Sequence, residues 1–313
     1  MGVHIAQIGT GRVGRPTAYT IMCSGLASKL TVCDIKPGLA KAFSEELRHV
    51  SASLGIDIEI IDCERDEDVT DADIILVSAG ESRQPGIRIS RRDLVMKNAN
   101  IIRYIAETTG QHNHHAKYVI ITNPVDAMAM VFQKYSGVDF VLSSGTNLES
   151  LRLRSELAKI FKIPVSKIQG WVGGEHGDSA VILWSSIKID KHGLEEFVAS
   201  NKSPFDKNEI AHYVKAIPEY ILDNIGATEY GPAASFRDIV QAIVQDTREI
   251  LAVATPRRFD SIPLPVHVSV PLTLGSKVGP TLFETLPYEE SQEIENAAKV
   301  IYNTYQVVVN GML

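Results

Sequence analysis

The stretch VHIAQIGTGRVG, residues 3–14, joins an apolar run typical of a strand to glycines at the spacing GxGxxG. The helical periodicity expected from 13 to 24 places these glycines between a strand and a helix N-terminus. There, glycines leave room for a phosphate, which backbone N–H groups and the helix N-terminus can hold. A plain glycine turn is the alternative. The residues expected to hold a dinucleotide pyrophosphate are Gly9, Gly11 and Gly14, with Arg12 and Val13.

Asp34 follows the next expected strand, Leu30 to Cys33, and lies 20 residues beyond Gly14. A carboxylate at this position can accept hydrogen bonds from the hydroxyls of an adenosine ribose. It favours NAD over NADP because a 2′-phosphate would meet its negative charge. Lys36 could soften that repulsion, so tolerance of NADP stays open. The structural alternative for Asp34 is a cap at the end of the strand.

The rest of the first half alternates short apolar runs with amphipathic stretches. Strands are expected at 3–8, 30–33, 56–61, 74–79, 118–122 and 138–143, and helices at 13–24, 39–53, 92–109 and 126–135. Strands this apolar need cover on both faces, which favours a parallel sheet with helices on each side. We predict an α/β fold in which residues 1–144 form a Rossmann, doubly wound parallel sheet that binds the dinucleotide.

After Gly145 the pattern changes, which predicts a mixed α+β substrate domain over residues 145–313. Its expected helices are 148–161, 207–225, 232–254 and 289–308, and its expected strands 168–172, 180–187, 266–274 and 281–284. In parallel α/β sheets, ligands bind beyond the carboxyl ends of the strands. Motifs at strand ends are therefore the first candidates for function.

Composition narrows the class of partner. The chain has 313 residues, 44% of them apolar, and a net charge of −7 without long basic runs. We therefore expect a small-molecule substrate, no nucleic acid and no membrane partner, and a cytoplasmic location. Cys23, Cys33 and Cys63 lack CxxC spacing and are expected to be buried thiols. The histidines of HNHH, residues 112–115, are interpreted as a solvated turn, and no metal site is expected.

Four motifs together resemble the lactate and malate dehydrogenase family over nearly the whole chain. They are GTGRVG with Asp34, ITNPVD at 121–126, SGTNLESLRLR at 144–154 and GGEHGDS at 173–179. The segment YGPAAS at 230–235 is similar to a branch of malate dehydrogenases that resemble lactate dehydrogenases, which is common in archaea and often tetrameric. The resemblance implies NAD as cofactor and a homodimer or homotetramer.

Reduction of a 2-ketoacid needs a hydride, a proton, a cation for the carboxylate and a positive group near the carbonyl. His176 resembles the family's proton donor, and its unperturbed pKa suits that task. Glu149 matches the aspartate that orients the histidine, a departure that adds one methylene to the side chain. Its alternative is a helix-face ion pair with Arg152.

Arg152 resembles the family's clamp on the substrate carboxylate, which a guanidinium can bind through two hydrogen bonds. Asn123 resembles the residue that hydrogen-bonds substrate and cofactor, and Thr228 resembles a pocket-wall residue of the second domain. The structural alternatives are a surface arginine for Arg152 and an Asn-Pro turn for Asn123.

The segment AGESRQPGIRISRRD, residues 79–93, follows a strand end and has the character of a lid over an anionic substrate. Arg83 resembles the residue that reads the far end of the substrate, which is arginine in malate-type members and glutamine in lactate-type members. Arg91 resembles the arginine that polarises the carbonyl. About two extra residues near Ile87 make Arg88 an alternative for that role.

The resemblance implies an NAD-dependent 2-hydroxyacid dehydrogenase of the malate type, which transfers hydride between NADH and oxaloacetate in the tricarboxylic acid cycle. Three alternatives stay open. The first is a lactate or broad-specificity 2-ketoacid dehydrogenase, and the second is an NAD-dependent glycoside hydrolase, which would need a metal. The third is an NAD-responsive binding module without catalysis.

Overall fold

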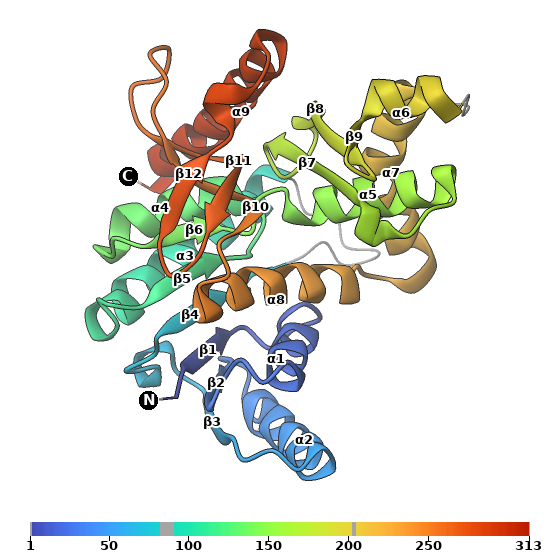
Figure 1. Cartoon of the computed structure of the whole chain (residues 1–313). Coiled ribbons are helices and arrows are strands. Elements are labelled where there is room, and N and C mark those ends of the chain that lie inside the picture. Colours follow the sequence, from blue (N-terminus) through green and yellow to red (C-terminus); the bar gives the residue numbers. More distant parts are fainter. Residues whose placement is uncertain (1, 82–90, 202–204, 313) are drawn as a thin grey trace.

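The structure is a computed structural model that describes residues 2–81, 91–201 and 205–312, with side chains described again from Asp93 onward (Figure 1). Arg83 and Arg88 lie outside the described residues. The backbone of Arg91 begins a helix, and its side chain lies outside the described part. The predicted roles of these three arginines therefore stay predictions.

The first half alternates strands and helices. Its elements are β1 (His4–Ile8), α1 (Gly14–Cys23), β2 (Lys29–Cys33), α2 (Leu39–Leu54), β3 (Glu59–Cys63), β4 (Ile74–Val77), α3 (Arg91–His112), β5 (Lys117–Ile120), α4 (Val125–Ser136) and β6 (Val141–Ser143), with a 3-10 turn at Asp66–Asp68. The strands pair in parallel in the order β3-β2-β1-β4-β5-β6. This is the strand order of a Rossmann fold, and the predicted fold class is confirmed.

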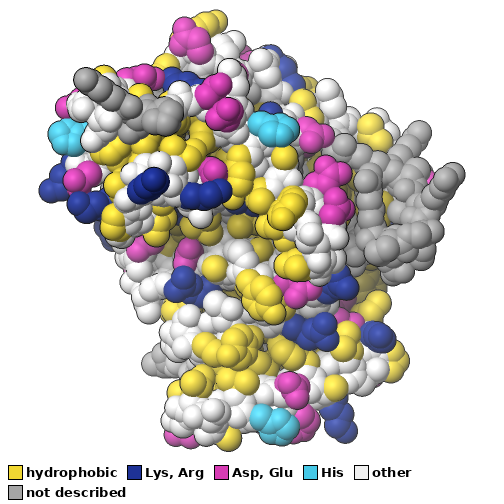
Figure 2. All heavy atoms as spheres, turned by 90° about the vertical axis from the view of Figure 1, so that its right-hand side faces the viewer, with side chains coloured by type: hydrophobic (Ala, Val, Ile, Leu, Met, Phe, Trp, Pro, Cys, Tyr) yellow, Lys and Arg dark blue, Asp and Glu magenta, His cyan; other side chains and the backbone are white. Residues whose placement is uncertain are grey.

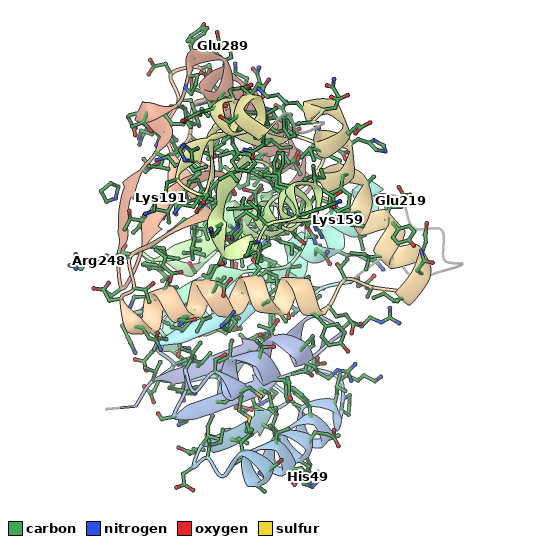
Figure 3. The ribbon with its side chains drawn as sticks, turned by 45° about the vertical axis from the view of Figure 1, so that its right-hand side comes forward. His49, Lys159, Lys191, Glu219, Arg248 and Glu289 are labelled. Atoms are coloured by element: carbon green, nitrogen blue, oxygen red, sulfur yellow. The ribbon has the colours of Figure 1, made fainter. Side chains whose placement is uncertain are left out.

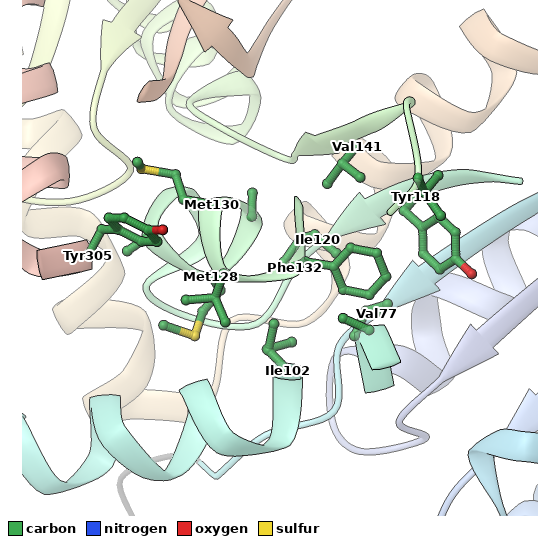
Figure 4. Close-up of a cluster of buried hydrophobic side chains, with 14 of the residues drawn as sticks. Val77, Ile102, Tyr118, Ile120, Met128, Met130, Phe132, Val141 and Tyr305 are labelled. Atoms are coloured by element: carbon green, nitrogen blue, oxygen red, sulfur yellow. The ribbon is translucent and has the colours of Figure 1, made fainter. Parts of the chain in front are cut away.

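Apolar side chains on both faces of this sheet explain why the strands are central. All four residues of β4 are buried. Figure 4 shows one of the clusters, where Phe132 of α4 lies against Tyr118 of β5, with their ring centroids 4.6 Å apart. Tyr305, from the last helix of the chain, belongs to the same cluster. Burial of each large apolar side chain contributes about 1.5–3 kcal/mol.

The second half is mixed. Its elements are α5 (Asn147–Phe161), β7 (Ile168–Gly174), β8 (Ala180–Ile189), β9 (His192–Gly193), α6 (Leu194–Asn201), α7 (Lys207–Ile225), α8 (Tyr230–Gln245), β10 (Glu249–Arg257), β11 (Val266–Leu274), β12 (Val278–Thr281) and α9 (Tyr288–Met312), with 3-10 turns at Val165–Lys167 and Phe283–Thr285. The strands pair antiparallel. They continue the first sheet through β10, where Ala254 pairs with Ser143 of β6.

The expected helix over 232–254 is wrong in its second part. Helix α8 ends at Gln245, and β10 follows after a turn in which Asp246 and Arg248 have φ of 49° and 56°. The run EILAVATPR is short and apolar, and such a run fits a buried helix and a buried strand equally well. Pairing with β6 on one side and β11 on the other makes it a strand.

Smaller corrections concern element ends. The strand expected at 56–61 is found as β3 at Glu59–Cys63, and the strand expected at 281–284 is found as β12, which ends at Thr281. Helix α6 and the short strand β9 were not predicted. Cys23 is exposed on the last turn of α1, so the expectation that it is buried is wrong. Cys33 is buried, and Cys63 is half-buried.

The outside of the molecule carries both charged and apolar side chains (Figure 2). Figure 3 shows His49, Glu219, Arg248 and Glu289 at its periphery, on segments far apart in the chain. Figure 2 shows separate patches of hydrophobic side chains on the face that it draws. No helix in the described part of the chain is both long and apolar enough to cross a lipid bilayer.

Candidate active site

Most of the predicted site residues follow carboxyl ends of strands, and the fold brings them together. A cavity of about 410 Å³ lies where the glycine turn after β1, the loops after β5 and β6, and the loop after β7 meet α7 and α8. Six of the predicted residues line it: Val13, Asn123, Glu149, Arg152, His176 and Thr228. A cavity with a few convergent polar groups is the usual form of a small-molecule site.

The glycine turn is shaped by its neighbours and is open on one side. Gly9 has φ of +87°, and a Cβ on it would lie 2.5 Å from the backbone nitrogen of Ala79. A Cβ on Gly14 would lie 1.9 Å from the carbonyl oxygen of Gly9. At Gly11, by contrast, a Cβ would meet no described atom within 4 Å. The turn therefore fits a pyrophosphate approaching over Gly11 at the N-terminus of α1.

Asp34 reaches the glycine turn from the end of β2. Its Oδ2 accepts hydrogen bonds from the backbone nitrogen of Thr10 at 2.8 Å and from Thr10 Oγ1 at 3.1 Å. Its Oδ1 accepts one from the backbone nitrogen of Lys36 at 3.0 Å. These contacts make Asp34 a cap at the strand end, and its remaining lone pairs can still accept from a ribose hydroxyl. The two interpretations of Asp34 are therefore compatible.

Arg12 contacts the connection between α7 and α8. Its guanidinium donates a hydrogen bond to the carbonyl oxygen of Gly226, and its Nε lies 3.9 Å from Glu229 Oε1. These residues flank Thr228 in the connection between α7 and α8. The side chain of Arg12 thus links the glycine turn to the segment that carries Thr228, and its predicted contact with the cofactor stays a prediction.

His176 lies in the loop that follows β7, and its imidazole lies at ion-pair distance from Glu149 of α5. Its Nδ1 is 3.0 Å from Glu149 Oε1, and the side chains are 23% and 7% exposed, respectively. The same Glu149 oxygen accepts a hydrogen bond from Arg152 Nη1 at 3.1 Å. The helix-face ion pair with Arg152 is therefore present, and the position of Glu149 is compatible with the orienting role, which stays a prediction. The other oxygen of Glu149 is buried and receives no hydrogen bond from the described residues.

Burial and mutual charge interactions shift the pKa values of His176, Glu149 and Arg152. Burial alone would lower the pKa of His176, but the carboxylate of Glu149 more than offsets it and holds that pKa above its ordinary value. Burial alone would raise the pKa of Glu149, but His176 and then Arg152 bring it below its ordinary value. Burial lowers the pKa of Arg152, partly countered by Glu149. The raised pKa of His176 favours its protonated form, and the guanidinium of Arg152 lines the cavity.

Asn123 lies in the loop between β5 and α4, and its carbonyl oxygen accepts a hydrogen bond from Asn98 Nδ2 of α3 at 2.8 Å. Because the backbone is held in this way, the side chain of Asn123 is positioned beside the cavity. Thr228 reaches the same cavity from the second half of the chain. Within residues 2–81, 91–201 and 205–312, no three His, Cys, Asp or Glu side chains are grouped closely enough to bind a metal ion.

Sequence reasoning assigned no role to Asp126, although it ends the quoted motif ITNPVD. In the structure its Oδ2 accepts a hydrogen bond from the backbone nitrogen of His176 at 2.8 Å. Lys215, on α7, was also missed, and it lines the cavity. The position of Asp126, three residues after Asn123 at a strand end, was the available signal for it. Nothing local distinguishes Lys215 from a surface lysine.

Comparison with known proteins adds independent evidence. The chain is 38% identical to malate dehydrogenase of Sulfurisphaera tokodaii over 303 residues, 96% of this chain and 95% of that protein. It is 32% identical to L-lactate dehydrogenase of Mesomycoplasma hyopneumoniae (strain 232), covering 99% of each. The crystal structure of Cryptosporidium parvum malate dehydrogenase superposes with a TM-score of 0.90 at 27% identity, covering 99% of this chain and 100% of that one.

Family models match both halves of the chain. The NAD binding domain of lactate/malate dehydrogenase matches residues 3–140. The alpha/beta C-terminal domain of lactate/malate dehydrogenase matches residues 146–310. With the strand order, the glycine turn and the histidine-carboxylate pair already described, these matches show that the chain belongs to the lactate/malate dehydrogenase family.

Proposed function

We propose that the protein is an NAD-dependent malate dehydrogenase that interconverts oxaloacetate and malate. The observation that carries the proposal is the cluster of His176, Glu149 and Arg152, with side chains at most 23% exposed, at a cavity beside the glycine turn. Similarity to the malate dehydrogenase of Sulfurisphaera tokodaii at 38% identity supports the choice of substrate. A proton donor and a carboxylate-binding cation on one wall suit a 2-ketoacid.

Different side chains bind the substrate and transfer the proton during reduction of the ketoacid. Arg152 binds the substrate carboxylate through its guanidinium and so fixes the reacting carbon in the cavity. His176 carries the proton for the new hydroxyl, and Glu149, beside Nδ1, orients the imidazole so that Nε2 faces the substrate. In the reverse direction His176 accepts the proton from malate. Asn123 and Thr228 complete the wall around the substrate.

NAD, when bound, supplies or accepts the hydride. Its pyrophosphate would lie at Gly9, Gly11 and Gly14, and its adenosine ribose at Asp34, whose charge disfavours the 2′-phosphate of NADP. Val13 lines the cavity at the end of the glycine turn, where the two ligands would meet. Arg12 stands close enough to that turn to contact the cofactor after a change of rotamer.

Recognition of the second carboxylate of oxaloacetate is assigned to Arg83, and polarisation of the carbonyl to Arg91, or to Arg88 as the alternative. We place the domain boundary at 144/145, which gives a dinucleotide-binding domain over 1–144 and a substrate domain over 145–313. A homodimer or homotetramer is proposed from the family resemblance, and a cytoplasmic location stays a prediction.

The test compares kcat/KM for oxaloacetate and pyruvate with NADH, in the wild type and in Arg83→Gln. We expect the wild type to prefer oxaloacetate, and the substitution to reduce that preference by about 100-fold because a buried second carboxylate loses its cation. Lys207→Gln, on the surface of the second half, serves as the control for loss of one positive charge. A wild type that turns over pyruvate as well as oxaloacetate would instead identify a lactate or broad 2-ketoacid dehydrogenase.

The similarity to L-lactate dehydrogenase of Mesomycoplasma hyopneumoniae keeps that alternative as the second candidate. The glycoside hydrolase and the binding-module alternatives have less support. Family membership and the pairing of His176 with a buried carboxylate both favour proton transfer to a ketoacid.

A further inference from the structure

A second buried carboxylate, that of Asp126, contacts the backbone of the histidine loop. Asp126 lies in the first turn of α4 and is 2% exposed. Its Oδ2 accepts a hydrogen bond from the backbone nitrogen of His176 at 2.8 Å, and its Oδ1 accepts one from Ser143 Oγ at 2.6 Å. Both carboxylate oxygens are thus engaged, one with the histidine loop and one with the end of β6.

The contact network of Asp126 joins three segments of the site. Ser143 Oγ also accepts a hydrogen bond from the backbone nitrogen of Gly145 at 3.2 Å. Gly145 lies just ahead of α5, the helix that carries Glu149 and Arg152. Asp126 therefore connects the loop of the proton donor to the segment that leads into the helix with the orienting carboxylate and the clamp.

We propose that Asp126 is a positioning residue that anchors the backbone of His176 and places a second negative charge beside its imidazole. The inference rests on the proposed function, because it presumes that His176 is the proton donor. It assigns a role to a group that the proposed reaction does not otherwise use. Asp126 does not touch the substrate and acts through His176.

The effect of Asp126 on the pKa of His176 depends on the other charges around the imidazole. Among the described residues, the titratable or charged groups around His176 are Glu149 and Arg152 on α5, Asp126 on α4, Glu175 and Asp178 in its own loop, and Lys215 of α7, which lines the same cavity. Glu149 and, more weakly, Asp126 raise the pKa of His176, whereas burial and Arg152 lower it. Loss of the Asp126 charge should therefore lower the pKa of His176.

Burial raises the pKa of Asp126 itself to about 6, although its hydrogen bonds from Ser143 and from the backbone of His176 oppose that rise. The carboxylate is ionised at pH 8 and becomes neutral as the pH falls through about 6. At mildly alkaline pH Asp126 is therefore fully ionised, and its negative charge stabilises the protonated imidazole of His176. An ordinary histidine would already have lost its proton at that pH.

Asp126→Asn separates charge from geometry. The amide oxygen can accept from the backbone nitrogen of His176 while the amide nitrogen donates to Ser143 Oγ, so the anchor remains and the charge is lost. Asp126→Ala removes both. Asp66→Asn is the matched control, because Asp66 is equally buried, has its pKa raised to about 6 by burial, and bonds to Cys33 away from the histidine.

The experiment titrates His176 by NMR in the full chain with 15N-labelled histidine, and measures kcat and KM for oxaloacetate from pH 5 to 9. The His176 signal is assigned by its loss in His176→Gln. We expect Asp126→Asn to lower the pKa of His176 by about one pH unit. The alkaline fall of kcat should move by the same amount, with KM nearly unchanged. Asp66→Asn should leave the His176 titration as in the wild type.

Asp126→Ala should lower kcat further than Asp126→Asn, and the asparagine variant should therefore act as a partial rescue. Equal His176 titration in the wild type and in Asp126→Asn would overturn the proposal, whatever the activities. If the NMR shift occurs in a protein that turns over neither oxaloacetate nor pyruvate, Asp126 does position His176 and the proposed function fails. The two failures are thus distinguishable.

Discussion

One oxygen of Glu149 lies 3.0 Å from His176 Nδ1 and 3.1 Å from Arg152 Nη1. The family aspartate at this position is one methylene shorter, and the longer side chain extends between α5 and the histidine loop. A single carboxylate oxygen therefore lies between the imidazole of His176 and the guanidinium of Arg152. Removal of the charge should affect proton transfer first, because the pKa of His176 depends on Glu149 more than on any other charged group.

Glu149→Gln is expected to move the pH dependence of oxaloacetate reduction to lower pH. The reaction needs protonated His176, whose pKa in the folded enzyme lies above the ordinary value of 6.5, so activity should fall as pH rises through that raised pKa. Without the Glu149 charge, burial should bring the fall below pH 6.5. At pH 7.5 we expect kcat/KM to drop on the order of 100-fold or more.

Glu156→Gln is the control for Glu149→Gln. Glu156 lies on the same helix and has its own i,i+3 partner, Lys159, at 3.4 Å. Its substitution should leave the pH profile unchanged. Undiminished activity in Glu149→Ala would show that the carboxylate does not orient the histidine.

The pair formed by His176 and Glu149 also contributes to folding stability. The pH dependence of that contribution follows from the raised pKa of His176. The folded state holds the His176 proton more tightly than the unfolded chain does, so this stabilisation is fully present below pH 6.5 and is lost as pH rises through the folded pKa. In the wild type the free energy of unfolding should therefore fall over that range. The slope should be smaller in His176→Gln when the two are compared by urea titration.

Asp34 governs cofactor choice through its charge. Asp34→Ser removes the repulsion toward a 2′-phosphate, so we expect the ratio of kcat/KM for NADPH to that for NADH to rise about tenfold or more. Lys36→Ala in the Asp34→Ser background should reverse part of that gain, because Lys36 is the nearby cation. An unchanged ratio in Asp34→Ser would place the adenosine ribose elsewhere.

At the scale of the element, the turn between β1 and α1 separates glycines needed by the fold from a glycine available to a ligand. Gly14 packs on the carbonyl of Gly9, and Gly9 packs on the backbone of Ala79. Gly11 faces open space. The spacing GxGxxG cannot assign these different roles, since all three positions look alike in the sequence.

Alanine substitutions test that division. Gly14→Ala should destabilise the protein by about 1–3 kcal/mol because the backbone must shift to admit the methyl group. Gly11→Ala should unfold at the same temperature as the wild type or slightly above it. It should nevertheless bind NADH about tenfold or more weakly, because the methyl group occupies the approach of the pyrophosphate. Calorimetry and NADH fluorescence titration measure the two properties separately.

For the whole molecule, the continuous sheet is the dominant feature. Strand β10 pairs with β6 of the parallel half and with β11 of the antiparallel half, so backbone hydrogen bonds run from one half to the other. Helix α9 packs onto α3 and α4 as well as onto β11. Opening one half would therefore expose surface of the other, which favours unfolding as one unit.

Cofactor binding should reveal this coupling. Both tryptophans, Trp171 in β7 and Trp184 in β8, lie in the second half, whereas the glycine turn lies in the first. NADH at about 100 times its Kd should add about 2.7 kcal/mol to the free energy of unfolding. We expect tryptophan fluorescence and far-UV circular dichroism to report the same increase in Tm. A shift confined to the circular dichroism signal would mean that the two halves unfold independently.

Local patterns in the sequence determined the alternation of strands and helices, the glycine turn with Asp34, and the residue types of the site, because periodicity and motif spacing belong to neighbouring residues. Only tertiary structure decided that 249–257 is a strand, since its partners β6 and β11 supply the hydrogen bonds that select it. Likewise, the sharing of one Glu149 oxygen and the anchoring of His176 by Asp126 depend on contacts between residues 27 and 50 positions apart. Sequence spacing does not specify these distances, because they arise from the packing of β7 against α5 and from the hydrogen bond that joins the loop after β7 to α4.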